Sequence, residues 1–262
     1  MQGVEVAGVD PLCVIVVQDL TDELRRHIMA HLSAICYGDQ LVVEDAGFYS
    51  FTRTVREFLT RFDSKPEKTQ LGMVGELLIH VVAPMAYGDM MVASIYLNKE
   101  ERSIKKGFDL TFATSDWSAV WYAEVKSGRI GDGTAEAKVK KLLRTAAKDL
   151  TEKLDAANRR SLWDTAILDA GVTLSAPDAK TVKDILRDDA IAVEAGAPWQ
   201  KHGLVAAALF HPIGSACISH DGLADVVDGL DPDKRFASLR VIAVQKSTLE
   251  KVIQFLRDSA GQ

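Results

Sequence analysis

Cysteine is scarce in this sequence, and its distribution excludes two structural classes. The three cysteines, Cys13, Cys36 and Cys217, are widely separated and form neither a Cys-x-x-Cys pair nor a cluster with histidine. A structural zinc site or a disulfide framework would need such groupings. We therefore expect a chain that needs no covalent or metal staple and that works in the reducing cytoplasm.

The sequence also lacks a basic excess and a long hydrophobic run. Its 31 Lys and Arg residues are outnumbered by 37 Asp and Glu residues, and the net charge of −6 excludes a basic nucleic-acid coat protein. Apolar stretches such as 77–85 are much shorter than the roughly 20 residues that cross a bilayer, so we expect no membrane span. With 47% hydrophobic and 26% charged residues, the composition is that of a soluble globular protein.

Strand-like and helical segments alternate along the chain. Runs rich in β-branched, apolar or aromatic residues predict strands at 13–17, 41–51 (a strand or a hairpin), 91–97, 108–113, 119–125, 203–210 and 239–244. Apolar residues at helical spacing predict helices at 21–35, 54–61 and 70–82, a long helix with an apolar stripe at 139–154, two helices within 161–194, and a last helix from about 249. We expect Pro84 to end the helix at 70–82, because proline cannot continue a helix.

This order predicts a single α/β domain with a mixed central sheet flanked by helices. A turn at 114–116 would join two neighbouring strands and make them antiparallel. Within 1–262 we distinguish an N-terminal α/β part (1–66), a core (67–160), a helical insertion (161–200) and C-terminal strands with a helix (201–262).

Three polar residues lie where core strands should be apolar. Asp109 stands between Phe108 and Leu110, and Glu124 and Lys126 flank Val125. Because side chains alternate along a strand, Glu124 and Lys126 point to one face, which Asp109 can share if the two strands pair. Two carboxylates this close favour a divalent cation, and oxygen ligands suit Mg²⁺ or Mn²⁺. Such a site fits phosphodiester hydrolysis, with Lys126 orienting or deprotonating the attacking water, or stabilising the developing charge.

The spacing Asp-x14-Glu-x-Lys resembles the PD-(D/E)xK nuclease superfamily, in which these residues lie on adjacent strands of a mixed sheet. That resemblance implies a restriction-endonuclease-like core, with Asp109 and Glu124 as metal ligands and Lys126 as a catalytic residue. It also implies a further metal contact from Glu76, which follows Gly75 in the preceding helix. The proline that the superfamily carries before its aspartate is absent here.

More narrowly, the order Gly-Glu, Lys-Gly-Phe-Asp and Trp-Tyr-Ala-Glu-Val-Lys-Ser-Gly resembles HamA, the nuclease subunit of Hachiman bacterial anti-phage systems. This resemblance covers about 76–126, and by length plausibly the whole chain. It implies a DNA nuclease that a partner helicase holds inactive until damaged or phage DNA engages the helicase.

Charge near the proposed site agrees with a DNA substrate. Residues 99–160 contain 14 basic and 10 acidic residues, against the acidic balance elsewhere. Arg129 follows the Glu-x-Lys strand, and Lys138, Lys141 and Lys148 can share a face of the long helix, so they are candidate phosphate contacts. The alternative is that this face is only the solvent side of an amphipathic helix.

Other interpretations remain open for the same residues. A Glu-x-Lys strand can be a plain salt bridge, and Glu76 can pair with His80 one helical turn later. Trp117, Trp121 and Tyr122 can stack on unpaired bases or pack in the core. The whole chain can also be a non-catalytic interaction subunit whose nuclease-like fold docks on a helicase or another regulator.

Overall fold

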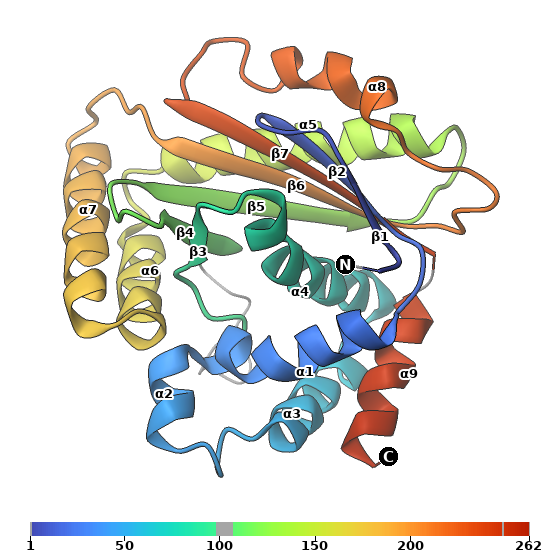
Figure 1. Ribbon diagram of the computed structural model, residues 1–262. Helices are drawn as coiled ribbons and strands as arrows, with labels where there is room; N and C mark the ends of the chain where they lie inside the picture. The colour runs from blue at the N-terminus through green and yellow to red at the C-terminus, as the bar shows by residue number, and fades with distance from the viewer. Residues whose placement is uncertain (1, 98–106, 248, 262) are drawn as a thin grey trace.

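Seven strands form one mixed sheet at the centre of the computed structural model, which describes residues 2–97, 107–247 and 249–261 (Figure 1). The strands are β1 (Val4–Ala7), β2 (Leu12–Val17), β3 (Met90–Val92), β4 (Leu110–Thr114), β5 (Val120–Gly128), β6 (His202–Phe210) and β7 (Ser238–Lys246). Their order across the sheet is β1-β2-β7-β6-β5-β4-β3. Strands β2, β7, β6 and β5 are parallel, whereas β1, β4 and β3 are antiparallel to their neighbours.

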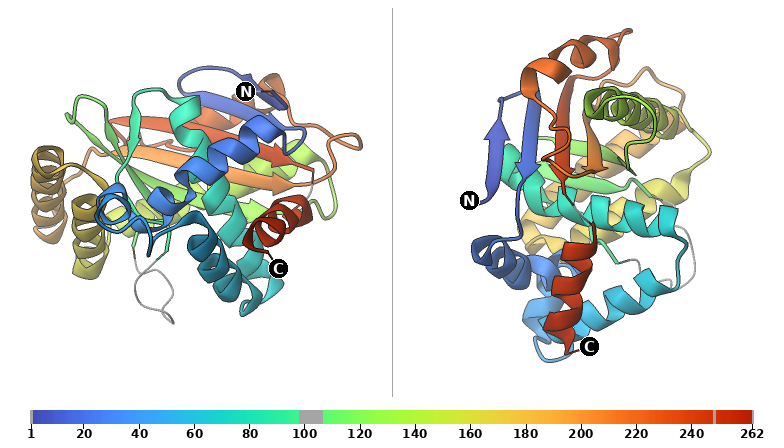
Figure 2. Two further views of the ribbon diagram at one scale, coloured as in Figure 1. Left: turned by 60° about the horizontal axis from the view of Figure 1, so that its bottom comes forward. Right: turned by 90° about the vertical axis from the view of Figure 1, so that its right-hand side faces the viewer.

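Helices cover both faces of the sheet and make two hydrophobic cores (Figure 2). One core lies under α1 (Asp22–Tyr37), α3 (Phe51–Asp63), α4 (Glu67–Ala86) and α9 (Leu249–Ala260), with α2 (Asp39–Glu44) beside α1. The other lies under α5 (Ala135–Leu154), α6 (Arg160–Thr173) and α7 (Ala176–Glu194), together with the short α8 (His220–Leu223) and the 3-10 helix η1 (Ala224–Gly229). The prediction of an α/β fold with a mixed sheet flanked by helices is confirmed.

Burial on both faces explains why the central strands are so apolar. Eight of the nine residues of β6 are buried, as expected for a parallel strand that helices cover on both sides. Local capping sets where the helices begin. The hydroxyl of Thr21 accepts a hydrogen bond from Leu24 N at 3.3 Å, and that of Thr134 accepts one from Ala137 N at 3.1 Å.

Helices α6 and α7, which fall in the segment expected to be an insertion, pack directly on the main body. The indole of Trp163 on α6 lies 5.3 Å, between ring centroids, from both Phe108 and Tyr122. The hydroxyl of Tyr122 donates to Asp189 on α7 at 2.6 Å. These helices therefore share the core on the α5 side of the sheet.

Three local expectations are wrong. The strand expected at 91–97 ends at Val92, and residues 93–97 are not part of a strand. Residues 41–51 form no strand: Gly38, with φ of +90°, ends α1 and leads into α2, and the β-branched Val43 is 82% exposed. The helix at 70–82 does not stop before Pro84, which lies within α4. Proline falls in the last turn, where it removes one backbone bond while Tyr87 N still closes on Ala83 O at 2.9 Å. Strand β1 was not expected from the sequence.

Helix α4 is the one helix of the described residues that is long and apolar enough to cross a membrane by length and composition. It lies against β5 and β6, and ten of its residues are buried in the core of the protein. That packing is typical of the central helix of a globular domain.

Candidate active site

The candidate site forms where β4 begins and β5 extends beyond it. Strands β4 and β5 pair from Leu110 opposite Ala123 to Ala113 opposite Val120, so one step further brings Asp109 beside Glu124. Beyond that point, residues 124–128 of β5 pair with β6 and with no other described strand. The Asp109 carboxylate takes the place of a strand partner, because its Oδ2 accepts a hydrogen bond from Val125 N at 2.9 Å.

Alternation along β5 directs Glu124 and Lys126 toward α5. Their neighbours Ala123 and Val125 belong to the core under α4, on the opposite face. Lys126 Nζ lies 2.7 Å from Glu124 Oε1 and 2.8 Å from Asp149 Oδ2 of α5. The structure therefore brings Asp109, Glu124 and Lys126 together at one end of the sheet.

A second lysine, Lys153, completes this cluster from the last turn of α5. Its Nζ lies 2.5 Å from Glu124 Oε2 and 3.2 Å from Asp109 Oδ1, so one ammonium bridges the two carboxylates. Neither Lys153 nor Asp149 was singled out from the sequence. The one available signal was their spacing of four residues, which places them on the same face of α5.

Burial and neighbouring charges shift the pKa values of Glu124, Lys126 and Lys153. The Glu124 side chain is only 3% exposed, and its burial raises the pKa, as does the Asp109 charge, while Lys153 and Lys126 act in the opposite direction. For both lysines burial alone would lower the pKa. The carboxylates around them outweigh this effect and raise the pKa of Lys126 and of Lys153. Both lysines are therefore ammonium cations at neutral pH in this arrangement.

The oxygen atoms of Asp109 and Glu124 are placed to share a cation. Both lie within 3.2 Å of a single nitrogen, that of Lys153, which shows that one positive centre can contact both carboxylates. Mg²⁺ in phosphoryl-transfer sites is commonly held by one or two carboxylates, with waters and substrate oxygens completing its shell. The donor set fits such an ion. The described residues contain no group of three or more His, Cys, Asp or Glu side chains that could enclose a metal by themselves.

Glu76 is the fourth expected site residue. It is on α4, which packs on the other face of the sheet, and its charge acts on the buried Tyr96 in the core on that side. Gly75 before it permits close contact between α4 and β5, at Ser127. Among the described residues, the charge of Glu76 acts on Tyr96, and its role as a metal contact stays a prediction.

The expected DNA contacts differ in their surroundings. Arg129 Nη2 lies 2.9 Å from Glu250 Oε1, and Arg129 Nε lies 3.7 Å from Glu67 Oε1. Lys138 is half-buried on α5 beside Gly128 at the end of β5, whereas Lys141 is exposed. Lys138 therefore lies on the side of α5 that faces the end of β5. Arg129 is held by carboxylates of α4 and α9.

Two of the aromatic residues near the site are core residues. Trp121 is 5% exposed and Tyr122 is fully buried, so neither offers a ring face to an unpaired base. Arg240 lies over the Trp121 ring at 4.4 Å from its centroid. The packing interpretation is therefore the right one for both residues.

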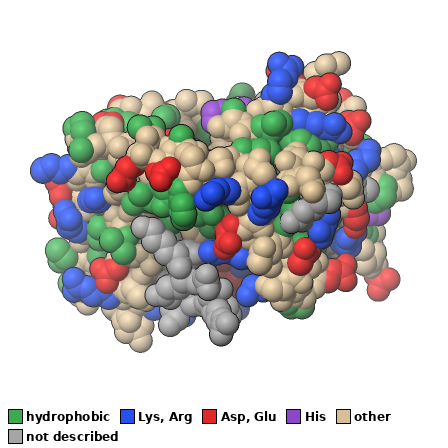
Figure 3. Space-filling view, turned by 90° about the horizontal axis from the view of Figure 1, so that it is seen from below, with side chains coloured by type: hydrophobic (Ala, Val, Ile, Leu, Met, Phe, Trp, Pro, Cys, Tyr) green, Lys and Arg blue, Asp and Glu red, His purple; other side chains and the backbone are tan. Residues whose placement is uncertain are grey.

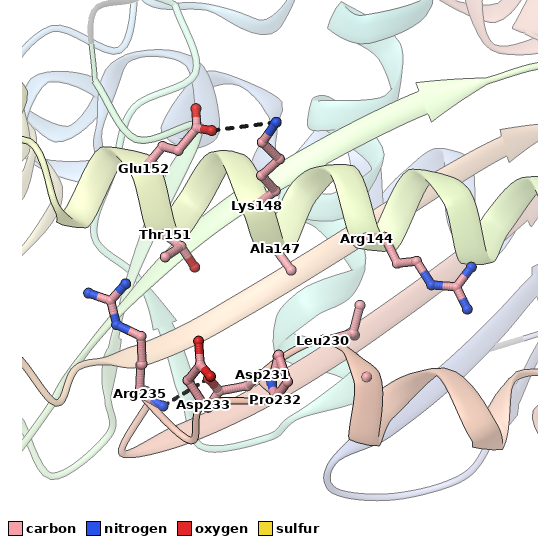
Figure 4. A pocket seen from close by; sticks show the side chains of 11 residues that line it. Arg144, Ala147, Lys148, Thr151, Glu152, Leu230, Asp231, Pro232, Asp233 and Arg235 are labelled. Atoms are coloured by element: carbon pink, nitrogen blue, oxygen red, sulfur yellow. Dashed lines mark hydrogen bonds and ion pairs between the residues drawn. The ribbon is translucent and has the colours of Figure 1, made fainter.

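Among the residues that the structure describes, no broad basic surface covers the α1, α3 and α9 side of the molecule. Acidic and basic side chains are interspersed across that face (Figure 3). A pocket of about 290 Å³ lies on the outer side of α5, against the segment 229–235, and it also mixes charges: Arg144, Lys148 and Arg235 with Glu152, Asp231 and Asp233 (Figure 4). Asp149 and Lys153 do not line it, so the site and this pocket use different faces of α5.

Comparison with known proteins identifies the family of the chain. The family model described as HamA matches residues 8–258. No curated protein matches the sequence. The match spans nearly all of the described fold, including both carboxylates and both lysines of the cluster, and it confirms the resemblance to HamA. The chain belongs to the HamA family, which is associated with Hachiman anti-phage defence.

Proposed function

We propose that the protein is a metal-dependent DNA nuclease of the PD-(D/E)xK type and the effector of a Hachiman defence system. The observation that carries this proposal is the convergence of Asp109 and Glu124 on one cationic position, with Lys126 beside them at the end of a strand. Family membership supports the defence role. A partner helicase that restrains the nuclease belongs to the same proposal.

In this proposal each residue of the cluster has a distinct task. Asp109 and Glu124 would hold Mg²⁺ or Mn²⁺, which when bound would polarise a phosphodiester oxygen and lower the pKa of a water. Lys126 acts as a fixed ammonium that orients the attacking water and stabilises charge on the phosphorus oxygens, because the carboxylates keep it protonated. Asp109 also anchors β5 through Val125 N, which holds the strand that carries Glu124 and Lys126. Lys138 and Arg129 contact substrate phosphates, Arg129 after release from its ion pairs, and Lys141 adds an exposed charge.

The proposal is tested with the purified chain on supercoiled plasmid and linear DNA, with Mg²⁺, with Mn²⁺ and with a chelator. Glu124→Gln removes one charged ligand with almost no change of shape, and Glu152→Gln on the outer side of α5 is the matched control. We expect metal-dependent cleavage by the wild type and by Glu152→Gln, and none by Glu124→Gln. Cleavage that Glu124→Gln retains would refute the assignment.

One observation favours a second candidate. In the described cluster Lys153 and Lys126 already neutralise much of the carboxylate charge, as in a purely structural ion-pair network. A non-catalytic interaction subunit would need no more than this. It would co-purify with a partner and cut no DNA, with or without that partner, in any of the metal conditions above.

A further inference from the structure

Lys153 occupies a place in the cluster that the proposed chemistry does not use. Its Nζ is within contact distance of both proposed metal ligands, whereas Lys126 contacts Glu124 and Asp149. Mg²⁺ or Mn²⁺ held by Asp109 and Glu124 would therefore have to approach the same oxygens that the Lys153 ammonium contacts. Two cations close to the same pair of carboxylates repel each other in a buried site.

The charge of the cluster favours a divalent cation that replaces Lys153 over one that binds beside it. Counted over the residues that the structure describes, Asp109, Glu124 and Asp149 with Lys126 and Lys153 carry one net negative charge in their ordinary ionised forms. A divalent cation added to all five side chains would leave a net positive cluster. A divalent cation that takes the place of Lys153 leaves it neutral, which is the cheaper arrangement for charges removed from water.

The Lys153 side chain can also move away from the two carboxylates. It lies in the last turn of α5, its side chain is 18% exposed, and lysine has a long and flexible stem. Asp149, one helical turn earlier on the same face, is 36% exposed, so this side of the cluster is open to solvent, where a displaced ammonium can be hydrated. Lys126, by contrast, contacts only one of the two proposed metal ligands and is also paired with Asp149.

We propose that Lys153 is a built-in counter-ion that keeps the metal-free site closed and is displaced from Asp109 and Glu124 when a divalent cation binds. Lys153 then sets the metal affinity of the site, and the nuclease is latent at low metal concentration. This inference rests on the proposed function for the identity of the metal ligands. It assigns to Lys153 a role in metal exchange, distinct from that of Lys126.

Direct binding of Mn²⁺ to the DNA-free protein tests the idea without any measurement of cleavage. In isothermal titration calorimetry, Lys153→Met should bind Mn²⁺ about tenfold more tightly or better, since it keeps the length of the side chain and removes the competing charge. Lys153→Arg keeps the charge and should bind as weakly as the wild type. Lys148→Met, outside the cluster on α5, is the control. Equal affinity of Lys153→Met and the wild type would overturn the proposal.

A second measurement uses only the wild type, in case Lys153→Met folds poorly. The rate of acylation of each lysine, followed by mass spectrometry, should rise several-fold at Lys153 when Mn²⁺ is added, and should stay constant at the exposed Lys148. An unchanged or slower rate at Lys153 would contradict displacement. If Mn²⁺ binding and Lys153 acylation change as expected but the protein cuts no DNA, only the nuclease proposal is refuted. If the protein cuts DNA but neither changes, only the displacement of Lys153 is refuted.

Discussion

Replacing Gly75 by alanine should show whether close packing against the sheet outweighs helix propensity in the stability of α4. Gly75 lies in the middle of α4, where the helix meets β5 and β6. A Cβ atom built on Gly75 would overlap the Ser127 hydroxyl and would stand 2.9 Å from Ser127 Cβ and 3.1 Å from Ala208 Cβ. Real Cβ atoms do not approach so closely. In Gly75→Ala, therefore, either α4 must lift from the sheet or Ser127 must shift, and Ser127 directly follows Lys126.

The magnitude follows from two opposing effects. Overpacking of a close-packed interior costs about 1 to 3 kcal/mol, while replacing a helical glycine by alanine gains about 1 kcal/mol. The net destabilisation by Gly75→Ala is then up to about 2 kcal/mol. Gly72 lies one turn earlier in the same helix with no atom near its added Cβ. Gly72→Ala should therefore gain about 1 kcal/mol without any cost, which makes it a matched control.

Urea unfolding and thermal unfolding of both variants provide the assay. A change of 1 kcal/mol corresponds to about 2 to 4 °C for a chain of this size, so the two midpoints should move in opposite directions. Ser127→Gly in the Gly75→Ala background removes both overlapping atoms and should restore most of the lost stability. If Gly75→Ala were as stable as Gly72→Ala, the close contact of α4 with β5 would be refuted.

Two further predictions concern charge. Lys246 is 1% exposed, its Nζ has no hydrogen-bond partner among the residues described here, and burial lowers its pKa from 10.5 to about 8. Because the unfolded chain binds this proton more tightly, the charged form costs about 3 kcal/mol at pH 7, and stability rises as pH increases from 8 to 10.5. Lys246→Met should raise the melting temperature at pH 7, and the difference should fade toward pH 10.5; a constant difference would contradict this reasoning. For DNA binding, we expect Lys138→Gln in the inactive Glu124→Gln background to reduce the slope of log affinity against log salt by about one, as measured by fluorescence anisotropy. Lys180→Gln on α7, whose lysine pairs with Asp184 at 3.3 Å, should leave that slope unchanged, and equal effects of the two variants would argue against a phosphate contact at Lys138.

The central elements were predictable from the sequence because their apolar residues are stable only in the buried interior. Apolar runs such as that of β6 must be buried, and the stripe from Val139 to Leu154 specifies which side of α5 faces the sheet. The failed prediction at 41–51 has the opposite cause. Val42 and Val43 favour strands, but residues of α2 are not buried and have no sheet edge to pair with. The turn at Gly38 leads the chain into a helix instead.

The candidate site was predictable to the extent that polar residues interrupted core strands. Asp109, Glu124 and Lys126 stood out for that reason, and the register of β4 with β5 places them together. Asp149 and Lys153 interrupt no apolar segment and so did not stand out. The polar side of an amphipathic helix carries charged residues whether it faces solvent or a functional site. The helix that carries Glu76 is apolar on nearly all sides, so its sequence gives no indication of which face of the sheet it covers.

The location of the site follows from the unequal lengths of two neighbouring strands. If β4 continued along β5, main-chain hydrogen bonds would satisfy residues 124–128 and no side chain would be needed at their edge. Because β4 begins at Leu110, Val125 N needs another acceptor, and the Asp109 carboxylate supplies it from just before the strand. That bond holds a negative charge beside the buried Glu124, and the two carboxylates then require positive charge in the same small volume. The structure meets this requirement with Lys126 and Lys153, one on the strand and one on the helix. A pair of carboxylates held together by the backbone and balanced in part by a flexible ammonium is an arrangement in which one cation can be exchanged for another without refolding.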